Sequence, residues 1–155
     1  MIQQATQQDI PQLSKLLQYI CDLHAKIRPD LFAAGKSKYN EQQLLELLQD
    51  SSRPIFVYRN EEGLAVGYIF CVVKLWQGEG FVSQKSLYID DLCVDQQYQH
   101  KGIGKALFNY ARNYAKEIQC HNITLNVWQG NDSAIKFYQN LGLSVQRTFL
   151  EEILY

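Results

Sequence analysis

The sequence lacks the features that would indicate a metal site, a disulfide framework or a membrane anchor. Its four cysteines, Cys21, Cys71, Cys93 and Cys120, are widely separated and include no Cys-x-x-Cys pair, so neither zinc ligation nor disulfides are expected. No apolar run approaches the ~18 residues of a transmembrane helix, and polar glutamines stand where a signal peptide would be apolar. We therefore expect a cytoplasmic protein with free thiols and no metal.

The sequence also lacks an excess of charge of either sign. The 155 residues include 15 Lys and Arg against 16 Asp and Glu, and the basic residues are scattered, whereas nucleic-acid-binding domains gather theirs into a patch. There is no internal repeat, low-complexity run or linker, and the 46% apolar content supports one core. We predict one domain over residues 1–155 that binds neither nucleic acid nor membrane.

Hydrophobic periodicity predicts an α/β chain. Two amphipathic helices follow a short first strand, an antiparallel meander comes next, and a parallel crossover leads to the last third. The predicted elements are a strand over 1–5, helices over 6–26 and 40–50, strands over 55–59, 64–76 and 83–94, a helix over 102–118, a strand over 122–128, a helix over 131–141, and a closing hairpin over 143–148 and 151–155.

The turn before the third long helix has the composition of an anion site. It reads Gln-His-Lys-Gly-Ile-Gly over 99–104. Gly102 and Gly104 permit close backbone approach, and free N–H groups at a helix N-terminus suit a pyrophosphate. Positive charge is added by His100, Lys101 and Lys105. An ordinary tight turn is the alternative, and the dinucleotide-binding motif fails because a leucine replaces its third glycine.

This turn resembles the acyl-CoA-binding signature Gln/Arg-x-x-Gly-x-Gly/Ala of the GCN5-related N-acetyltransferases, since Gln99, Gly102 and Gly104 match every fixed position. The segment 131–143 is similar to their second signature, Asn-x-x-Ala-x-x-x-Tyr-x-x-x-Gly-Phe, with Leu143 in place of the final Phe. The order of elements is similar to the whole family fold. The resemblance implies a mixed, mostly antiparallel sheet with splayed central strands, flanked by helices.

The resemblance also implies acetyl-CoA as the co-substrate. Main-chain groups of the strand at the splay would pair with the pantetheine arm, the amides of the turn would hold the pyrophosphate, and one asparagine of the second signature would contact the cofactor. The residues so assigned are Leu92, Cys93, Val94, Gln99, His100, Lys101, Gly102, Ile103, Gly104, Lys105 and Asn131.

Two catalytic residues follow from the resemblance. Tyr138 matches the family tyrosine that protonates the departing thiolate, although its spacing also fits a core tyrosine. An acceptor ammonium must lose a proton before it attacks, and Asp90 matches the putative base of polyamine acetyltransferases, whose Tyr-Leu-Glu-Asp segment is similar to residues 88–91. The alternative for Asp90 is pairing with a basic neighbour. Strand alternation predicts that Asp91 points to the opposite face.

Acceptor contacts are predicted for Asp91 and His24. An acidic pair favours a cationic acceptor, and His24 and Arg28 lie four residues apart at the end of the first helix, where the family's acceptor site is often walled. Trp128 fits a core, a dimer interface or the mouth of this site. Ribosomal-protein N-terminal acetyltransferases place a glutamate base where this chain has Asn126, which disfavours a protein N-terminus as acceptor.

These features predict an acetyl-CoA-dependent N-acetyltransferase for a small primary amine, polyamine-like or amino-acid-like, working as a homodimer. A protein N-terminal or lysine acetyltransferase remains open. So does a non-catalytic acyl-CoA sensor, against which the presence of Tyr138 and Asp90 argues. No motif identifies the acceptor.

Overall fold

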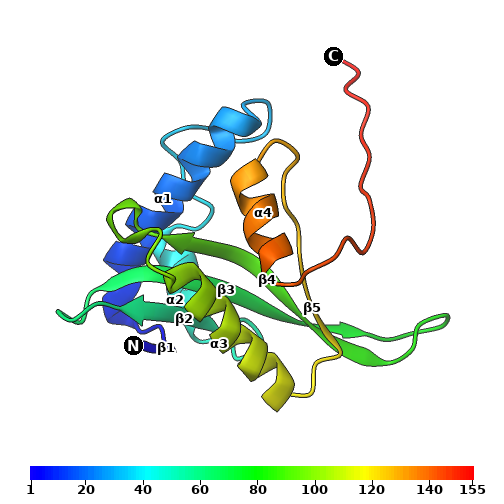
Figure 1. Cartoon of the computed structure of the whole chain (residues 1–155), viewed down its shortest axis with the longest axis horizontal. Coiled ribbons are helices and arrows are strands. Elements are labelled where there is room, and N and C mark those ends of the chain that lie inside the picture. Colours follow the sequence, from blue (N-terminus) through cyan, green and yellow to red (C-terminus); the bar gives the residue numbers. More distant parts are fainter.

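The computed structural model describes all 155 residues. Helices cover both faces of one five-stranded sheet (Figure 1). The strands are β1 (Ile2–Gln4), β2 (Ile55–Arg59), β3 (Ala65–Trp76), β4 (Gln84–Val94) and β5 (Asn122–Leu125). The helices are α1 (Ile10–Ile27), α2 (Glu41–Leu48), α3 (Ile103–Glu117) and α4 (Asp132–Asn140), with short 3-10 turns η1 (Gln7–Asp9) and η2 (Gln96–Tyr98). None of these helices is long and apolar enough to cross a membrane.

The sheet has the order β1-β2-β3-β4-β5. Its first four strands pair antiparallel, and β5 pairs parallel to β4, so the predicted mixed, mostly antiparallel fold is confirmed. The parallel pairing ends where Ile89 meets Leu125, whereas β4 runs on to Val94. The two strands therefore separate beyond Ile89, which is the splay that the resemblance implies.

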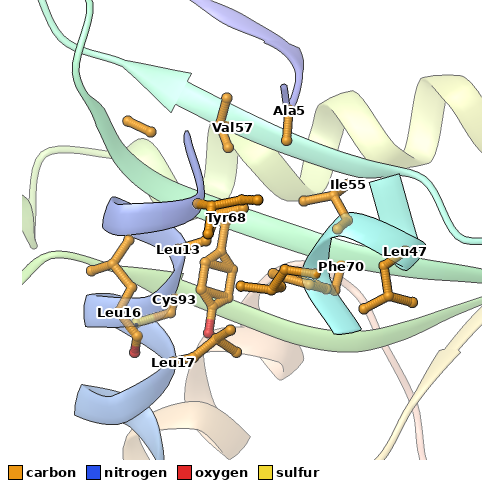
Figure 2. Close-up of a cluster of buried hydrophobic side chains, with 13 residues drawn as sticks. Ala5, Leu13, Leu16, Leu17, Leu47, Ile55, Val57, Tyr68, Phe70 and Cys93 are labelled. Carbon is orange, nitrogen blue, oxygen red and sulfur yellow. Dashed lines mark hydrogen bonds between the residues drawn. The ribbon is translucent and has the colours of Figure 1, made fainter. Parts of the chain in front are cut away.

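Two apolar clusters hold the helices on the sheet. The first lies under α1 and α2, where Leu13, Leu17 and Tyr68 have no exposed surface (Figure 2). The second lies under α3 and includes Ile69 and Leu107, which are equally buried. Leucines at helical spacing thus bring each helix onto its face, and truncating one such residue to alanine costs about 2–5 kcal/mol.

The C-terminal part differs from the prediction. β5 ends at Leu125 rather than at residue 128, because beyond the splay it has no partner. The closing hairpin is absent: residues 143–155 have no regular secondary structure, and no backbone hydrogen bond involves residues 144–155. Their apolar alternation is typical of strands, but a strand also needs a neighbour to pair with.

Candidate active site

A β-bulge at Asp90 shapes the start of the splay. On β3, Phe70 pairs with Asp91 and Cys71 pairs with Ile89, so Asp90 has no partner. An extra residue of this kind resets the alternation of side chains along a strand. Both carboxyl groups consequently lie on the side of the sheet that α1 and α2 cover, and the prediction of opposite faces is wrong.

The Asp90 carboxylate is held by basic and hydroxyl groups. The Lys38 ammonium donates to Asp90 Oδ1 over 2.8 Å, the Tyr39 hydroxyl donates to Oδ2 over 2.6 Å, and Arg53 lies 4.0 Å from Oδ2. Only 13% of the Asp90 side chain is exposed. Its geometry therefore fits the alternative that the sequence left open, a carboxylate that pairs with basic neighbours.

Asp91 has a different environment. Its carboxylate accepts a 2.9 Å hydrogen bond from the buried hydroxyl of Tyr68. Burial raises the pKa of Asp91 to about 6, although the Lys38 charge and the Tyr68 hydrogen bond lower it in part. A carboxyl group with a pKa near 6 can take and release protons close to neutral pH, as a general base must.

Tyr138 lies on α4 across the splay. Its ring packs edge-on against Phe108 and Phe137, with centroid distances of 6.1 and 5.0 Å. Burial raises the pKa of Tyr138 above its usual value, and the negative charge of Asp91 raises it further. The two groups are thus within electrostatic reach, and the phenol keeps its proton at neutral pH, as a proton donor requires.

The turn before α3 presents a row of free donors. His100 and Gly102 have left-handed backbones, with φ of 61° and 79°, and the Ala106 N–H makes the first bond of the helix, to the Gly102 carbonyl. None of the N–H groups from His100 to Lys105 donates to an acceptor within the chain. Successive free amides in alternating conformations form an anion-binding concavity, so this turn fits a pyrophosphate.

Other members of the predicted cofactor site support the turn. Gln99 donates from Nε2 to the Val94 carbonyl over 3.0 Å and so ties the turn to β4. A Cβ on Gly104 would meet the Phe137 ring at 3.3 Å, so the glycine permits α3 to pack against α4. Ile103 is buried in the core and presents only its main chain.

The remaining residues predicted to bind the cofactor include three on β4 beside the splay. Leu92 and Val94 pack toward α3, whereas Cys93 is buried on the α1 side, so their main chain, unpaired on the β5 side, is what they can offer a ligand. Asn131 caps α4 by accepting from the Ala134 N–H over 3.2 Å, which leaves its side-chain amide free. Lys101 is exposed, with its ammonium 5.1 Å above the Tyr98 ring.

An aromatic wall stands at the C-terminal end of α1. The His24 and Phe32 rings lie 5.0 Å apart, Phe32 meets Trp128 edge-on at 5.5 Å, and Arg28 lies 5.5 Å over Trp128. Burial lowers the pKa of His24, and the charge of Lys38 lowers it further. His24 therefore stands near the Lys38–Asp90 ion pair, and Trp128 belongs to this wall rather than to the core.

Four residues of the site were missed at the level of sequence: Phe32, Lys38, Tyr39 and Tyr68. The first three lie in the loop between α1 and α2, which carries no motif, and only the folded loop brings them to β4. Tyr68 occupies a position in β3 that the sequence pattern marks as apolar, so nothing in the sequence indicates a polar contact there. Its hydrogen bond to Asp91 depends on the bulge.

Residues 17–143 match the family model described as the acetyltransferase (GNAT) family. The chain belongs to this family. Among curated relatives, N-alpha-acetyltransferase 50 of Danio rerio is 33% identical over 111 residues, and spermine/spermidine N(1)-acetyltransferase of Bacillus subtilis (strain 168) is 32% identical over 57 residues. These matches cover 71% and 36% of this chain, but only 62% and 38% of the relatives' own lengths.

A solved structure has the same fold as this GNAT chain. The crystal structure of a single-residue mutant of the BH1408 protein from Bacillus halodurans matches it with a TM-score of 0.95 at 28% identity, over 100% of this chain and 99% of that one. The family and the fold expected from the two signatures are confirmed.

Proposed function

We propose that this GNAT chain is an acetyl-CoA-dependent N-acetyltransferase that acts in the cytoplasm on a small primary amine, polyamine-like or amino-acid-like. One observation carries the proposal. Asp91, with its pKa near neutrality, and Tyr138, which keeps its proton, are within electrostatic reach of each other beside the splay. A base and an acid so placed suit transfer of an acyl group from a thiol to an amine.

The residues present fit acetyl-CoA. The free amides from His100 to Lys105 are donors without acceptors, as a pyrophosphate needs. The unpaired edge of β4 and the free amide of Asn131 continue the site toward Tyr138. Acetyl-CoA would supply an activated acetyl thioester, and the chain supplies binding groups and proton transfer.

We assign the base to Asp91 and the acid to Tyr138. Asp91 takes the proton that the acceptor ammonium must lose, and Tyr138 holds at its hydroxyl the proton that a thiolate leaving group needs. The family resemblance assigns the base to Asp90, but the carboxylate oxygens of Asp90 are engaged by Lys38 and Tyr39. We therefore treat Asp90 as a residue that positions the loop between α1 and α2.

Two features support a cationic acceptor. The Lys38 ammonium donates both to the Asp90 carboxylate and, over 3.2 Å, to the Asp90 carbonyl, so an ammonium group fits beside this acidic pair. Trp128 and Phe32 add an aromatic surface on which cations bind well. The similarity to a spermine/spermidine acetyltransferase agrees with this chemistry.

A protein N-terminus is the second candidate acceptor. It is favoured by the match to N-alpha-acetyltransferase 50, which covers more of this chain than the polyamine match does. Against it, Asn126 occupies the position of the glutamate base that ribosomal-protein enzymes use, and its amide donates to the Tyr88 hydroxyl over 3.0 Å. An amide cannot act as a base.

The test is release of free thiol from acetyl-CoA with polyamines, amino acids, aminoglycosides and N-terminal peptides, in wild type, Asp91→Asn and Tyr138→Phe. The proposal requires turnover with a small amine and a loss of about 10²-fold or more in kcat in each variant. Tight acetyl-CoA binding without turnover would support the sensor alternative instead.

We further propose that the protein is a homodimer.

A further inference from the structure

Tyr68 is a fully buried tyrosine of β3 whose hydroxyl contacts a carboxylate. Its ring lies among apolar side chains under α1 that include Leu13 and Leu17 (Figure 2). These contacts involve the ring, which a phenylalanine would supply equally well. A buried hydroxyl needs a hydrogen-bond partner, and this one donates to Asp91 Oδ2 over 2.9 Å. The hydroxyl is therefore the feature of Tyr68 that core packing does not explain.

The register between β3 and β4 brings this hydroxyl to Asp91. Tyr68 pairs with Cys93, and Phe70 pairs with Asp91, so the four side chains share the face of the sheet under α1. Asp91 is the diagonal neighbour of Tyr68, a separation that an aromatic side chain can span. The Phe70 ring meets the Tyr68 ring edge-on, with the centroids 4.8 Å apart. Phe70 and the helix above it thus fix the direction of the hydroxyl.

The hydrogen bond engages one oxygen of Asp91 and leaves the other available. Asp91 Oδ1 accepts no hydrogen bond from a side chain. Asp91 keeps part of its surface exposed, whereas Tyr68 keeps none. A carboxylate held from the core side by one oxygen presents the other in a fixed direction, as a base needs for rapid proton transfer. Asp90 differs in this respect, because Lys38 and Tyr39 engage both of its oxygens.

We propose that Tyr68 is a positioning residue of the acetyl transfer, whose hydroxyl holds Asp91 Oδ2 and directs Oδ1 at the acceptor amine. This inference rests on the proposed role of Asp91 as the base. The hydrogen bond also stabilises the charged form of the carboxyl group, so it lowers the pKa of Asp91 against the larger effect of burial. Tyr68 thus orients the base and keeps it deprotonated near neutral pH.

Several other titratable groups lie within electrostatic reach of Asp91. They are Lys38 in the α1–α2 loop, Asp90 on β4, Cys21 on α1, Cys93 on β4 and Tyr138 on α4. Lys38 lowers the pKa of Asp91 and Asp90 raises it. The two thiols and the Tyr138 phenol have raised pKa values and stay neutral where Asp91 titrates. All of these groups remain in Tyr68→Phe, so a changed titration of Asp91 in that variant reports the lost hydroxyl.

The experiment compares the pH dependence of kcat/KM in wild type, Tyr68→Phe and Tyr39→Phe. The last variant is the matched control, because it removes a hydroxyl that donates to the neighbouring Asp90 over 2.6 Å. Loss of one hydrogen bond to a charged group should move the acidic limb of Tyr68→Phe to higher pH by about one unit. The limb of Tyr39→Phe should stay in place. An unmoved limb in Tyr68→Phe, or an equal shift in both variants, would overturn the proposal.

Carbon-13 NMR of the Asp91 carboxyl group measures the same effect without catalysis and reports whether each variant is folded. The titration midpoint should rise by about one unit in Tyr68→Phe and stay in place in Tyr39→Phe. An unchanged midpoint in Tyr68→Phe would overturn the role of Tyr68 alone. A raised midpoint without a shifted limb would overturn the role of Asp91 as the base, and with it the part of Tyr68 in the transfer.

Discussion

Asp90 and Asp91 are neighbours in sequence with different environments, and we propose that the difference separates a positioning carboxylate from a catalytic one. Asp90 is engaged by Lys38 and Tyr39, whereas Asp91 accepts a hydrogen bond from Tyr68 and has its pKa raised to about 6. A carboxyl group whose pKa is raised toward neutrality by burial is a common basis for an acid or base role.

The first prediction concerns Asp91→Asn. A base must be deprotonated, so wild-type kcat/KM should fall as the pH drops below about 6, the pKa of Asp91. Asp91→Asn should remove this acidic limb and lower kcat by about 10²-fold or more. Asp90→Asn is the matched control, and its profile should keep the limb. If Asp90→Asn abolished the limb and Asp91→Asn did not, the base would be Asp90.

The second prediction concerns Lys38→Met. The Lys38 ammonium lowers the pKa of Asp91, so its removal should move the acidic limb of the rate profile to higher pH. Lys15→Met removes an exposed charge that pairs with Asp95 at 3.8 Å, and it should leave the limb in place. An unchanged limb in Lys38→Met would show that Asp91 does not set it.

Among the elements, the start of α1 is fixed to β2 by a buried ion pair. Arg59 donates to both oxygens of Asp9 over 2.6 and 2.8 Å, and the Thr6 N–H donates over 2.8 Å. Burial alone would raise the pKa of Asp9, but the hydrogen bonds from Arg59 and Thr6 outweigh it, and the pKa lies below its usual value. The pair therefore stabilises the fold above pH ~4 and loses its effect as the pH falls through the lowered pKa.

The third prediction is that Asp9→Asn lowers the free energy of unfolding at neutral pH by about 3–5 kcal/mol, because the Arg59 charge is left without its partner. The loss should shrink below pH ~4, where the wild-type carboxylate begins to protonate. Urea unfolding at pH ~7 and pH ~3.5, on either side of that value, measures both. Asp30→Asn breaks an exposed pair with Arg28 and should change stability little; an equal loss there would contradict the role of burial.

The elements were largely predictable, and the bulge was not. Apolar periodicity marked the helices, and the Gln-x-x-Gly-x-Gly turn marked the start of α3 within a residue. The bulge at Asp90 depends on the register between β3 and β4, which single-strand patterns do not specify. Regular alternation of side chains along β4 predicts Asp90 and Asp91 on opposite faces, and the bulge interrupts that alternation.

For the whole molecule, the two signatures identified the family and the order of elements, which the fold confirms. The aromatic wall was not predictable as a unit, since His24, Phe32 and Trp128 come together only across three segments. The tail was predicted as a hairpin because its apolar alternation is strand-like. The pattern is typical of a strand, but it does not specify a neighbouring strand for the tail to pair with.

Thiol release from acetyl-CoA with a polyamine acceptor, followed across the acidic and neutral range in wild type and Asp91→Asn, tests the central claim most directly. We predict acetyl transfer in wild type, with an acidic limb near the Asp91 pKa of about 6, and the loss of both rate and limb in the variant. Transfer that is as fast in Asp91→Asn, or no transfer to any amine by a protein that binds acetyl-CoA, would contradict it.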